Sequence, residues 1–187
     1  MDQRALVERA QAGDHDAFAA LVERLLVKLD TAARLILRNP ELAQDAVQDG
    51  LIRAWRDIRG LRDTDRFEAW LYRLTVNACL DQARRRRRRP IEVEITLVEG
   101  PTAPDPNTSL ADRELVSQVL RRLDDRDRAV IVLHYYVGLP LTDVAVALGA
   151  PIGTVKSRLH RALGEMRTGI LAEMPLPQTP AARWTAS

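Results

Sequence analysis

The sequence predicts an all-α protein of two small helical domains joined by a flexible linker, the second of them a helix-turn-helix domain. Of its 187 residues, only 9 are glycine and 10 are proline, which leaves few residues for tight turns. Apolar residues recur at helical spacing before and after a long proline-bearing segment. We therefore expect a first domain over 1–89, a linker over 90–108, a second domain over 109–172 and a flexible tail over 173–187.

The first domain is expected to begin with two helices. Asp2 and Gly13 bracket a short one, because aspartate favours a helix start and glycine a helix end. An apolar stripe at helical spacing predicts the second. The members of this stripe are Phe18, Leu21, Val22, Leu25, Leu26 and Leu29.

Two more helices are expected to complete this domain. Asn39 and Pro40 supply an N-cap followed by proline at the first helical position. The apolar stripe of that helix consists of Val47, Leu51, Ala54 and Ile58. Asp65 and Glu68 resemble a capping box, from which a last helix runs to the arginines before Pro90.

The second domain contains the signals of a helix-turn-helix. Helix starts are expected near Ser109 and at Asp124 or Asp125, and Gly138 ends a helix. Two further helices flank a turn at Gly149, and the later one exposes basic and polar side chains where a recognition helix meets DNA. An ordinary helical hairpin with a basic face is the alternative. The residues expected to pack the two helices together are Ala145, Leu148, Val155, Leu159 and Leu163.

The net charge of +2 conceals strong segregation along the chain. Residues 1–83 carry −2, the six consecutive arginines 84–89 carry +6, residues 90–112 carry −5 and residues 113–172 carry +3. The polyarginine segment would attract nucleic acid or an acidic protein surface, although a solvated helix end or a targeting patch has the same composition.

The sequence indicates neither catalysis nor export. Cys79 is the only cysteine, no Cys and His cluster has zinc-ligand spacing, and no phosphate-binding glycine loop or nucleophile motif occurs. We therefore expect no catalytic residue, no metal and no cofactor. The first residues of the sequence are polar and charged, and no apolar run approaches about 20 residues. These two features predict a cytoplasmic protein without membrane insertion.

Three segments, in this order, resemble bacterial extracytoplasmic-function (ECF) sigma factors. They are DAVQDGLIRAW (45–55), FEAWLYRLTVNACLDQARRRRRR (67–89) and GTVKSRLHRAL (153–163), and the resemblance covers most of residues 1–170. It implies a protein that binds core RNA polymerase, recognises two elements of promoter DNA and helps to open it, without catalysing phosphodiester chemistry. An anti-sigma factor often accompanies such proteins, although no residue here identifies one.

The polymerase-binding helix of the family maps onto residues 45–55. Its polar face would meet the clamp helices of the largest polymerase subunit, and a solvated helix face is the alternative reading. Gly50 stands where the family usually has a larger apolar residue. It either lets another backbone approach closely or weakens this interface. The residues expected to bind polymerase are Asp45, Gln48, Asp49 and Arg53.

The reader of the downstream, minus-ten element maps onto the loop 60–65 and the helix from Phe67. Opening a duplex requires a pocket for an unstacked base, and Asn77 with the preceding loop would form it. Phe67 and Trp70 are expected to belong to the core instead, and Thr75 replaces a usual small residue. The residues expected to contact this element are Arg62, Asp63, Thr64, Arg73, Asn77, Arg84 and Arg85.

The reader of the upstream, minus-thirty-five element maps onto the last motif. Arg158 or Arg161 is expected to grip guanine bidentately, while other side chains position the helix on phosphates. Thr142 and Asp143 would supply an N-cap and a first-turn acid for the preceding helix. The residues expected to contact this element are Thr154, Lys156, Ser157, Arg158, His160 and Arg161.

Other interpretations stay open at this point. The acidic linker, with Glu92, Glu94, Glu99 and Asp105, resembles a segment that threads polymerase channels, but a plain solvated tether fits as well. A stand-alone DNA-binding regulator would use only residues 109–172 and bind duplex DNA tightly without polymerase. A helical hydrolase with scattered catalytic acids has little support.

Overall fold

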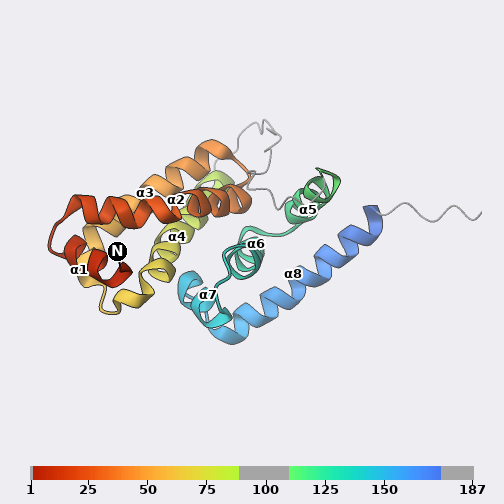
Figure 1. Ribbon diagram of the computed structural model, residues 1–187. Coiled ribbons are helices and arrows are strands. Elements are labelled where there is room, and N and C mark those ends of the chain that lie inside the picture. Colours follow the sequence, from red (N-terminus) through yellow and green to blue (C-terminus); the bar gives the residue numbers. More distant parts are fainter. Residues whose placement is uncertain (1, 89–109, 174–187) are drawn as a thin grey trace, which may run out of the picture.

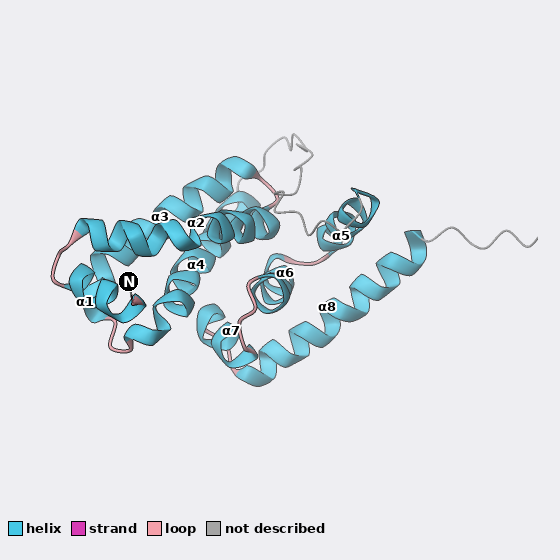
Figure 2. Ribbon diagram, in the orientation of Figure 1, coloured by secondary structure: helices cyan, strands magenta, loops and turns pink. Residues whose placement is uncertain are grey.

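The computed structural model describes residues 2–88 and 110–173, and every regular element within these two ranges is a helix (Figures 1 and 2). The predicted all-α fold is therefore confirmed. We call residues 2–88 the N-terminal module and residues 110–173 the C-terminal module. The predicted linker, almost all of the predicted tail and the helix start near Ser109 lie outside the described residues.

The N-terminal module consists of four α-helices and two short 3-10 turns. In chain order they are α1 (Gln3–Gln11), α2 (His15–Leu37), α3 (Pro40–Asp57), η1 (Ile58–Gly60), η2 (Thr64–Arg66) and α4 (Phe67–Arg88). The C-terminal module adds α5 (Leu110–Arg122), α6 (Asp125–Ile131), the π-helical segment η3 (Val132–Tyr136), α7 (Leu141–Leu148) and α8 (Ile152–Glu173).

Several helices begin and end where local side-chain chemistry predicts. The Asn39 side chain accepts a hydrogen bond from the backbone N–H of Leu42 at 2.8 Å, with Pro40 as the first residue of α3. Asp124 caps α6 by accepting hydrogen bonds from the N–H groups of the second and third residues after it. Gly149 ends α7 with φ of +58°, a left-handed conformation that glycine adopts without strain. The predicted turn of the helix-turn-helix is thus confirmed.

Three local predictions are wrong. Asp65 and Glu68 form no capping box: the Asp63 side chain instead accepts a hydrogen bond from the N–H of Asp65 at 3.1 Å and opens η2, so α4 begins at Phe67. Thr142 lies inside α7, whose N-cap position is Pro140.

The third wrong prediction concerns Leu163, which was expected to pack the two helices of the helix-turn-helix together. It is 38% exposed, while its neighbour Ala162 is fully buried. Ala162 takes the buried position instead and packs with Leu120, Leu123 and Ile131 in a cluster of its own.

The two modules are packed against each other and share one hydrophobic core. The helix α4 contacts α7, and α2 contacts both α6 and η3 (Figure 1). Buried apolar residues form one cluster that extends from Leu6 in α1, through Leu71 in α4, to Val144 in α7 and Val155 in α8. A linker of about 20 residues could span roughly 65 Å, so the chain permits separation, but in this structure the modules touch.

A buried arginine joins the modules. Arg128 of α6 is 4% exposed, and its guanidinium donates hydrogen bonds to the carbonyl oxygens of Leu120 at 2.9 Å, Leu123 at 2.6 Å and Ile36 at 2.5 Å. Ile36 belongs to the last turn of α2, where carbonyl groups lack partners within the helix. Burial lowers the pKa of Arg128 to about 10, but the three carbonyls and Asp125, at 3.3 Å, stabilise its charge.

Gly50 and Thr75, two of the departures from the family pattern, meet at the crossing of α3 and α4. A Cβ atom built on Gly50 would lie 2.7 Å from Thr75 Oγ1 and 2.9 Å from Thr75 Cα. The glycine therefore allows a close backbone approach, which was one of the two predicted explanations. The hydroxyl of Thr75 is buried without a hydrogen-bond partner.

We predict that Gly50→Ala destabilises the protein by about 1–3 kcal/mol, because α3 and α4 must separate to admit the methyl group. Gly164 in α8 has no atom within 4 Å of a built Cβ, so Gly164→Ala should instead stabilise by up to about 1 kcal/mol. Denaturant unfolding of both variants measures the two free energies. Thr75→Ala should recover part of the loss in the Gly50→Ala background, and equal effects of the two glycine substitutions would contradict this account.

Candidate functional site

The face of α3 that is expected to bind polymerase is accessible. Asp45 and Gln48 are exposed, and Asp49 and Arg53 are half-buried. The guanidinium of Arg53 lies 3.8 Å from Asp81 of α4. Ile52, which is 65% exposed, lies on the same side of the helix and was missed by the sequence reasoning. In the sequence, Ile52 could have been recognised as an apolar residue that does not belong to the buried apolar stripe of α3. Acidic, amide and apolar groups together form a surface suited to a protein partner.

The residues expected to contact the minus-ten element are spread along α4 rather than gathered. Arg62 and Asp63 are exposed in the loop before the helix, and Thr64 is half-buried there. Asn77 follows Phe67 by ten residues, which places it roughly 15 Å along the helix axis. The structure therefore does not bring Asn77 together with the loop that was expected to complete its pocket.

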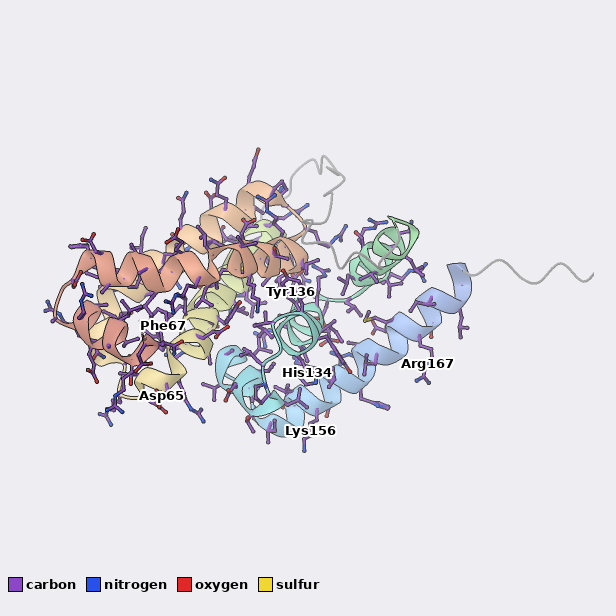
Figure 3. All side chains as sticks on the ribbon, in the orientation of Figure 1. Asp65, Phe67, His134, Tyr136, Lys156 and Arg167 are labelled. Atoms are coloured by element: carbon purple, nitrogen blue, oxygen red, sulfur yellow. The ribbon has the colours of Figure 1, made fainter. Side chains whose placement is uncertain are left out.

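The remaining members of this set lie farther along the helix. Arg73 is half-buried, and Arg84 and Arg85 are exposed near the end of α4, where Arg84 forms an ion pair with Asp81. Phe67 is fully buried, and its ring centroid lies 6.0 Å from that of the half-buried Trp70. The expectation that these two aromatic residues belong to the core is confirmed, because Phe67 is a member of the hydrophobic cluster and Trp70 packs against it. Figure 3 shows Phe67 within the N-terminal module.

Asn77 instead lines a cavity of about 120 Å³ between the modules. Leu80 and Arg84 share its face of α4, at the spacing that puts side chains on one side of a helix. The cavity joins residues expected to bind different promoter elements. The C-terminal module contributes Arg126, Leu148, Ala150, Thr154 and Arg158.

Five of the six residues expected to read the minus-thirty-five element are exposed on α8. They are Thr154, Lys156, Ser157, His160 and Arg161, while Val155 on the opposite side is fully buried. The hydroxyl of Ser157 donates to the carbonyl of Gly153 at 2.9 Å. Lys156 lies near the N-terminal end of α8, away from α1 and α2 (Figure 3). This half of α8 presents charged and polar side chains to an incoming ligand.

Two of the six, the half-buried Arg158 and the exposed Arg161, contact an acidic residue of α6. The Arg161 guanidinium donates from Nε to Asp127 Oδ2 and from Nη2 to Asp127 Oδ1, both at 2.7 Å. Arg158 Nη1 donates to the same Oδ1 at 2.9 Å. Asp127 is 1% exposed. Sequence reasoning missed both Asp127 and its neighbour Arg128, although two charges directly before an apolar run were a signal.

Three further titratable side chains, Cys79, His15 and His134, have structural contacts. Cys79 is fully buried, and burial raises the pKa of its thiol to about 12. The ring centroids of His15 and Trp55 lie 4.1 Å apart, and His134 Nδ1 lies 2.9 Å from the carbonyl oxygen of Leu139. Within residues 2–88 and 110–173, no three His, Cys, Asp or Glu side chains are grouped to hold a metal ion. Among the described helices, none has the length and hydropathy needed to cross a membrane.

Two protein families match this chain. The Sigma-70 region 2 family matches residues 21–89, within which α3 and α4 lie, and the Sigma-70 region 4 family matches residues 113–166, which include the helix-turn-helix. A stand-alone regulator that used only the C-terminal module would not need a Sigma-70 region 2 domain. The stand-alone regulator is therefore not favoured.

The sequences of several relatives align with most of this chain. The ECF RNA polymerase sigma factor SigW of Bacillus subtilis is 31% identical over 175 residues, which cover 86% of this chain and 92% of SigW. The ECF sigma-E factor of Haemophilus influenzae is 35% identical over 176 residues, covering 87% and 92% respectively. SigM of Mycobacterium tuberculosis is 36% identical over 166 residues, covering 85% and 83%.

Solved structures have the same architecture. CnrH in complex with the cytosolic domain of CnrY aligns with a TM-score of 0.68 at 29% identity, covering 92% of this chain and 99% of the compared chain. The sigma factor RpoE of Bartonella quintana, solved with the anti-sigma factor NepR, aligns with a TM-score of 0.65 at 26% identity, covering 81% and 96%. This chain belongs to the ECF sigma factors, which direct RNA polymerase to promoters.

Proposed function

We propose that three surfaces of this sigma factor divide its work in transcription initiation. The polar face of α3 around Gln48 binds core polymerase, Asn77 captures an unpaired base of the minus-ten element, and the exposed side of α8 reads the minus-thirty-five element. None of these steps makes or breaks a covalent bond, so the protein acts without catalysis of its own. It works in the cytoplasm, where polymerase transcribes the chromosome.

We propose further that the packed arrangement is an inactive, closed state. The closed state is inferred from the cavity between the modules, which is lined by Asn77 and Arg84 of α4 and by Thr154 and Arg158 of α8. Promoter elements centred about 25 base pairs apart are separated by on the order of 85 Å at 3.4 Å per base pair. One cavity cannot serve two such distant elements, so the modules must separate on the promoter.

The contacts between the modules suit a closed state that can open. Arg66 and Asp143 form an ion pair at 3.4 Å, and Arg87 and Asp125 form one at 2.9 Å. Both arginines are exposed, so each pair contributes little stability. The apolar contacts of α4 with α7 and of α2 with α6, together with the hydrogen bond from Arg128 to Ile36, hold the modules together, and binding of each module to a different part of polymerase can offset them.

An anti-sigma factor is a further proposed partner. The solved RpoE of Bartonella quintana is in complex with the anti-sigma factor NepR, and its fold is similar to that of this chain. An inhibitor of this class would act by stabilising the closed state or by covering α3.

The full chain should direct core polymerase to its own promoters. Run-off transcription from candidate promoters, with core alone as the control, measures this activity. Initiation at discrete sites only when the chain is added is the expected result. No transcription above the level of core alone would contradict the proposal.

A covalent link between the modules should abolish promoter opening. The substitutions Arg66→Cys and Asp143→Cys place thiols at the ion pair, where a short reducible crosslinker can join them; buried Cys79, whose pKa is raised to about 12, should not compete. The control is the pair Arg9→Cys and Asp14→Cys, which links two positions within the N-terminal module. Reduction should restore transcription of the first variant. Full activity of the crosslinked first variant would show that the modules need not separate.

Asn77→Ala should lower formation of the open promoter complex by roughly tenfold or more, because the captured base loses its hydrogen bonds to the amide. Affinity for core polymerase should remain unchanged, since Asn77 does not lie on α3. Permanganate reactivity of unpaired thymines measures opening, and a promoter that is already unpaired at the minus-ten element should rescue the variant. An equal loss of polymerase binding would show that the pocket is misassigned.

A further inference from the structure

The recognition helix α8 directs two of its arginines towards its own module. The carboxylate of Asp127 accepts three hydrogen bonds, two from Arg161 and one from Arg158, at 2.7–2.9 Å. The side chain of Asp127 is 2% exposed, and that of Arg158 is 21% exposed. We propose that Asp127 is a positioning residue for recognition of the minus-thirty-five element, and that Arg158 and Arg161 fix the helix rather than read bases. This inference rests on the proposed assignment of α8 to that element.

The geometry of Arg161 supports the proposal. Its Nε and Nη2 groups form one edge of the guanidinium fork, the kind of donor pair that grips the O6 and N7 atoms of guanine. In this protein Asp127 occupies that edge with both oxygens. If Arg161 turned to DNA, the buried carboxylate would be left with Arg158 alone. A buried charge that loses a partner costs more than one bidentate base contact supplies.

The packing of α8 explains why a directional contact is needed. The side of α8 that faces the module carries Val155 and Ala162, both fully buried, and the partly buried Leu159 and Met166. Apolar contacts have little directional preference, whereas an ion pair with fixed donor directions resists rotation of the helix about its axis. Asp127 is itself held, because its backbone N–H donates to Asp124 Oδ1 at 2.8 Å. The ion pairs therefore set the rotation of α8.

This rotation decides which side chains meet the bases. Thr154, Lys156, Ser157 and His160 are exposed and belong to the same two turns of α8 as the anchored arginines. With Arg158 and Arg161 anchored, direct reading of the element falls to these four residues. His160 and Ser157 can accept as well as donate hydrogen bonds, so the expected readout is not restricted to guanine.

The first test compares base preference in the complete holoenzyme. Transcription is measured on promoters that carry every single base-pair change in the upstream element, for Asp127→Asn, Arg161→Ala and the double variant. Both single variants should lose discrimination at several base pairs together, by about tenfold, and the double variant should be no worse than either. His160→Ala should change preference at only one or two base pairs. Arg161 is half exposed, so Arg161→Ala carries the test even if Asp127→Asn fails to fold.

The second test separates a contact with DNA from a contact within the protein. The affinity of holoenzyme for promoter DNA is measured over a range of salt concentrations. Lys156→Ala should lower the slope of log affinity against log salt by about 0.9, the value for one lost phosphate contact. Arg161→Ala removes the same charge from the same helix, yet should leave the slope unchanged, because that charge is paired with Asp127. A loss of folding alone would not produce this difference.

Two results would overturn the inference. One is a loss of discrimination at a single base pair in Arg161→Ala that Asp127→Asn does not share; the other is a salt slope that falls equally in Arg161→Ala and Lys156→Ala. If neither Lys156→Ala nor His160→Ala altered recognition of the upstream element, the assignment of α8 would itself fail and the inference with it. That result differs from the first two, in which α8 still reads DNA.

Discussion

The helix α4 has to bury more than one side, and the arrangement of the whole molecule depends on this constraint. Its buried residues include Phe67, Leu71, Val76 and Cys79, which do not fall on a single face. One side packs on α2 and α3, and another packs on α7 of the C-terminal module. A helix that is apolar on several sides requires partners on several sides. In the free protein, the C-terminal module supplies the second partner.

This constraint connects stability to function. The residues Asn77, Leu80 and Arg84 lie on the side of α4 that lines the cavity between the modules. A promoter that is to reach Asn77 must therefore displace the C-terminal module. The same surface serves as an intramolecular contact in the closed state and as a proposed DNA-binding surface in the open state. In the proposed mechanism, this competition lets polymerase binding control DNA binding without any change within either module.

Buried charges set the orientation of the helices around α6. Arg128 joins this helix to the end of α2 through the carbonyl of Ile36, and Asp127 joins it to α8 through Arg158 and Arg161. Apolar contacts are strong but have little directional preference, whereas hydrogen bonds between charged groups have defined directions. The two adjacent charges on α6 therefore fix orientations that the small apolar residues around them leave open.

The local features of this protein follow from its sequence alone. The N-caps Asn39 and Asp124 and the turn at Gly149 follow from interactions within a few residues, and the expected core positions of Phe67 and Val155 follow from helical periodicity. The prediction from sequence was wrong where either of two nearby residues could have capped a helix or filled a buried position. Asp63 rather than Asp65 opened η2, and Ala162 rather than Leu163 was buried.

The way in which distant segments combine depends on packing between helices that are far apart in the chain. The contact of Gly50 with Thr75, the ion pairs of Asp127, and the cavity beside Asn77 each join residues far apart in the chain. Periodicity indicates that a helix has an apolar side, but it does not indicate which helix covers that side or at what angle. Packing of complete side chains selects the partner and the crossing geometry, because neighbouring helices must fill space without voids.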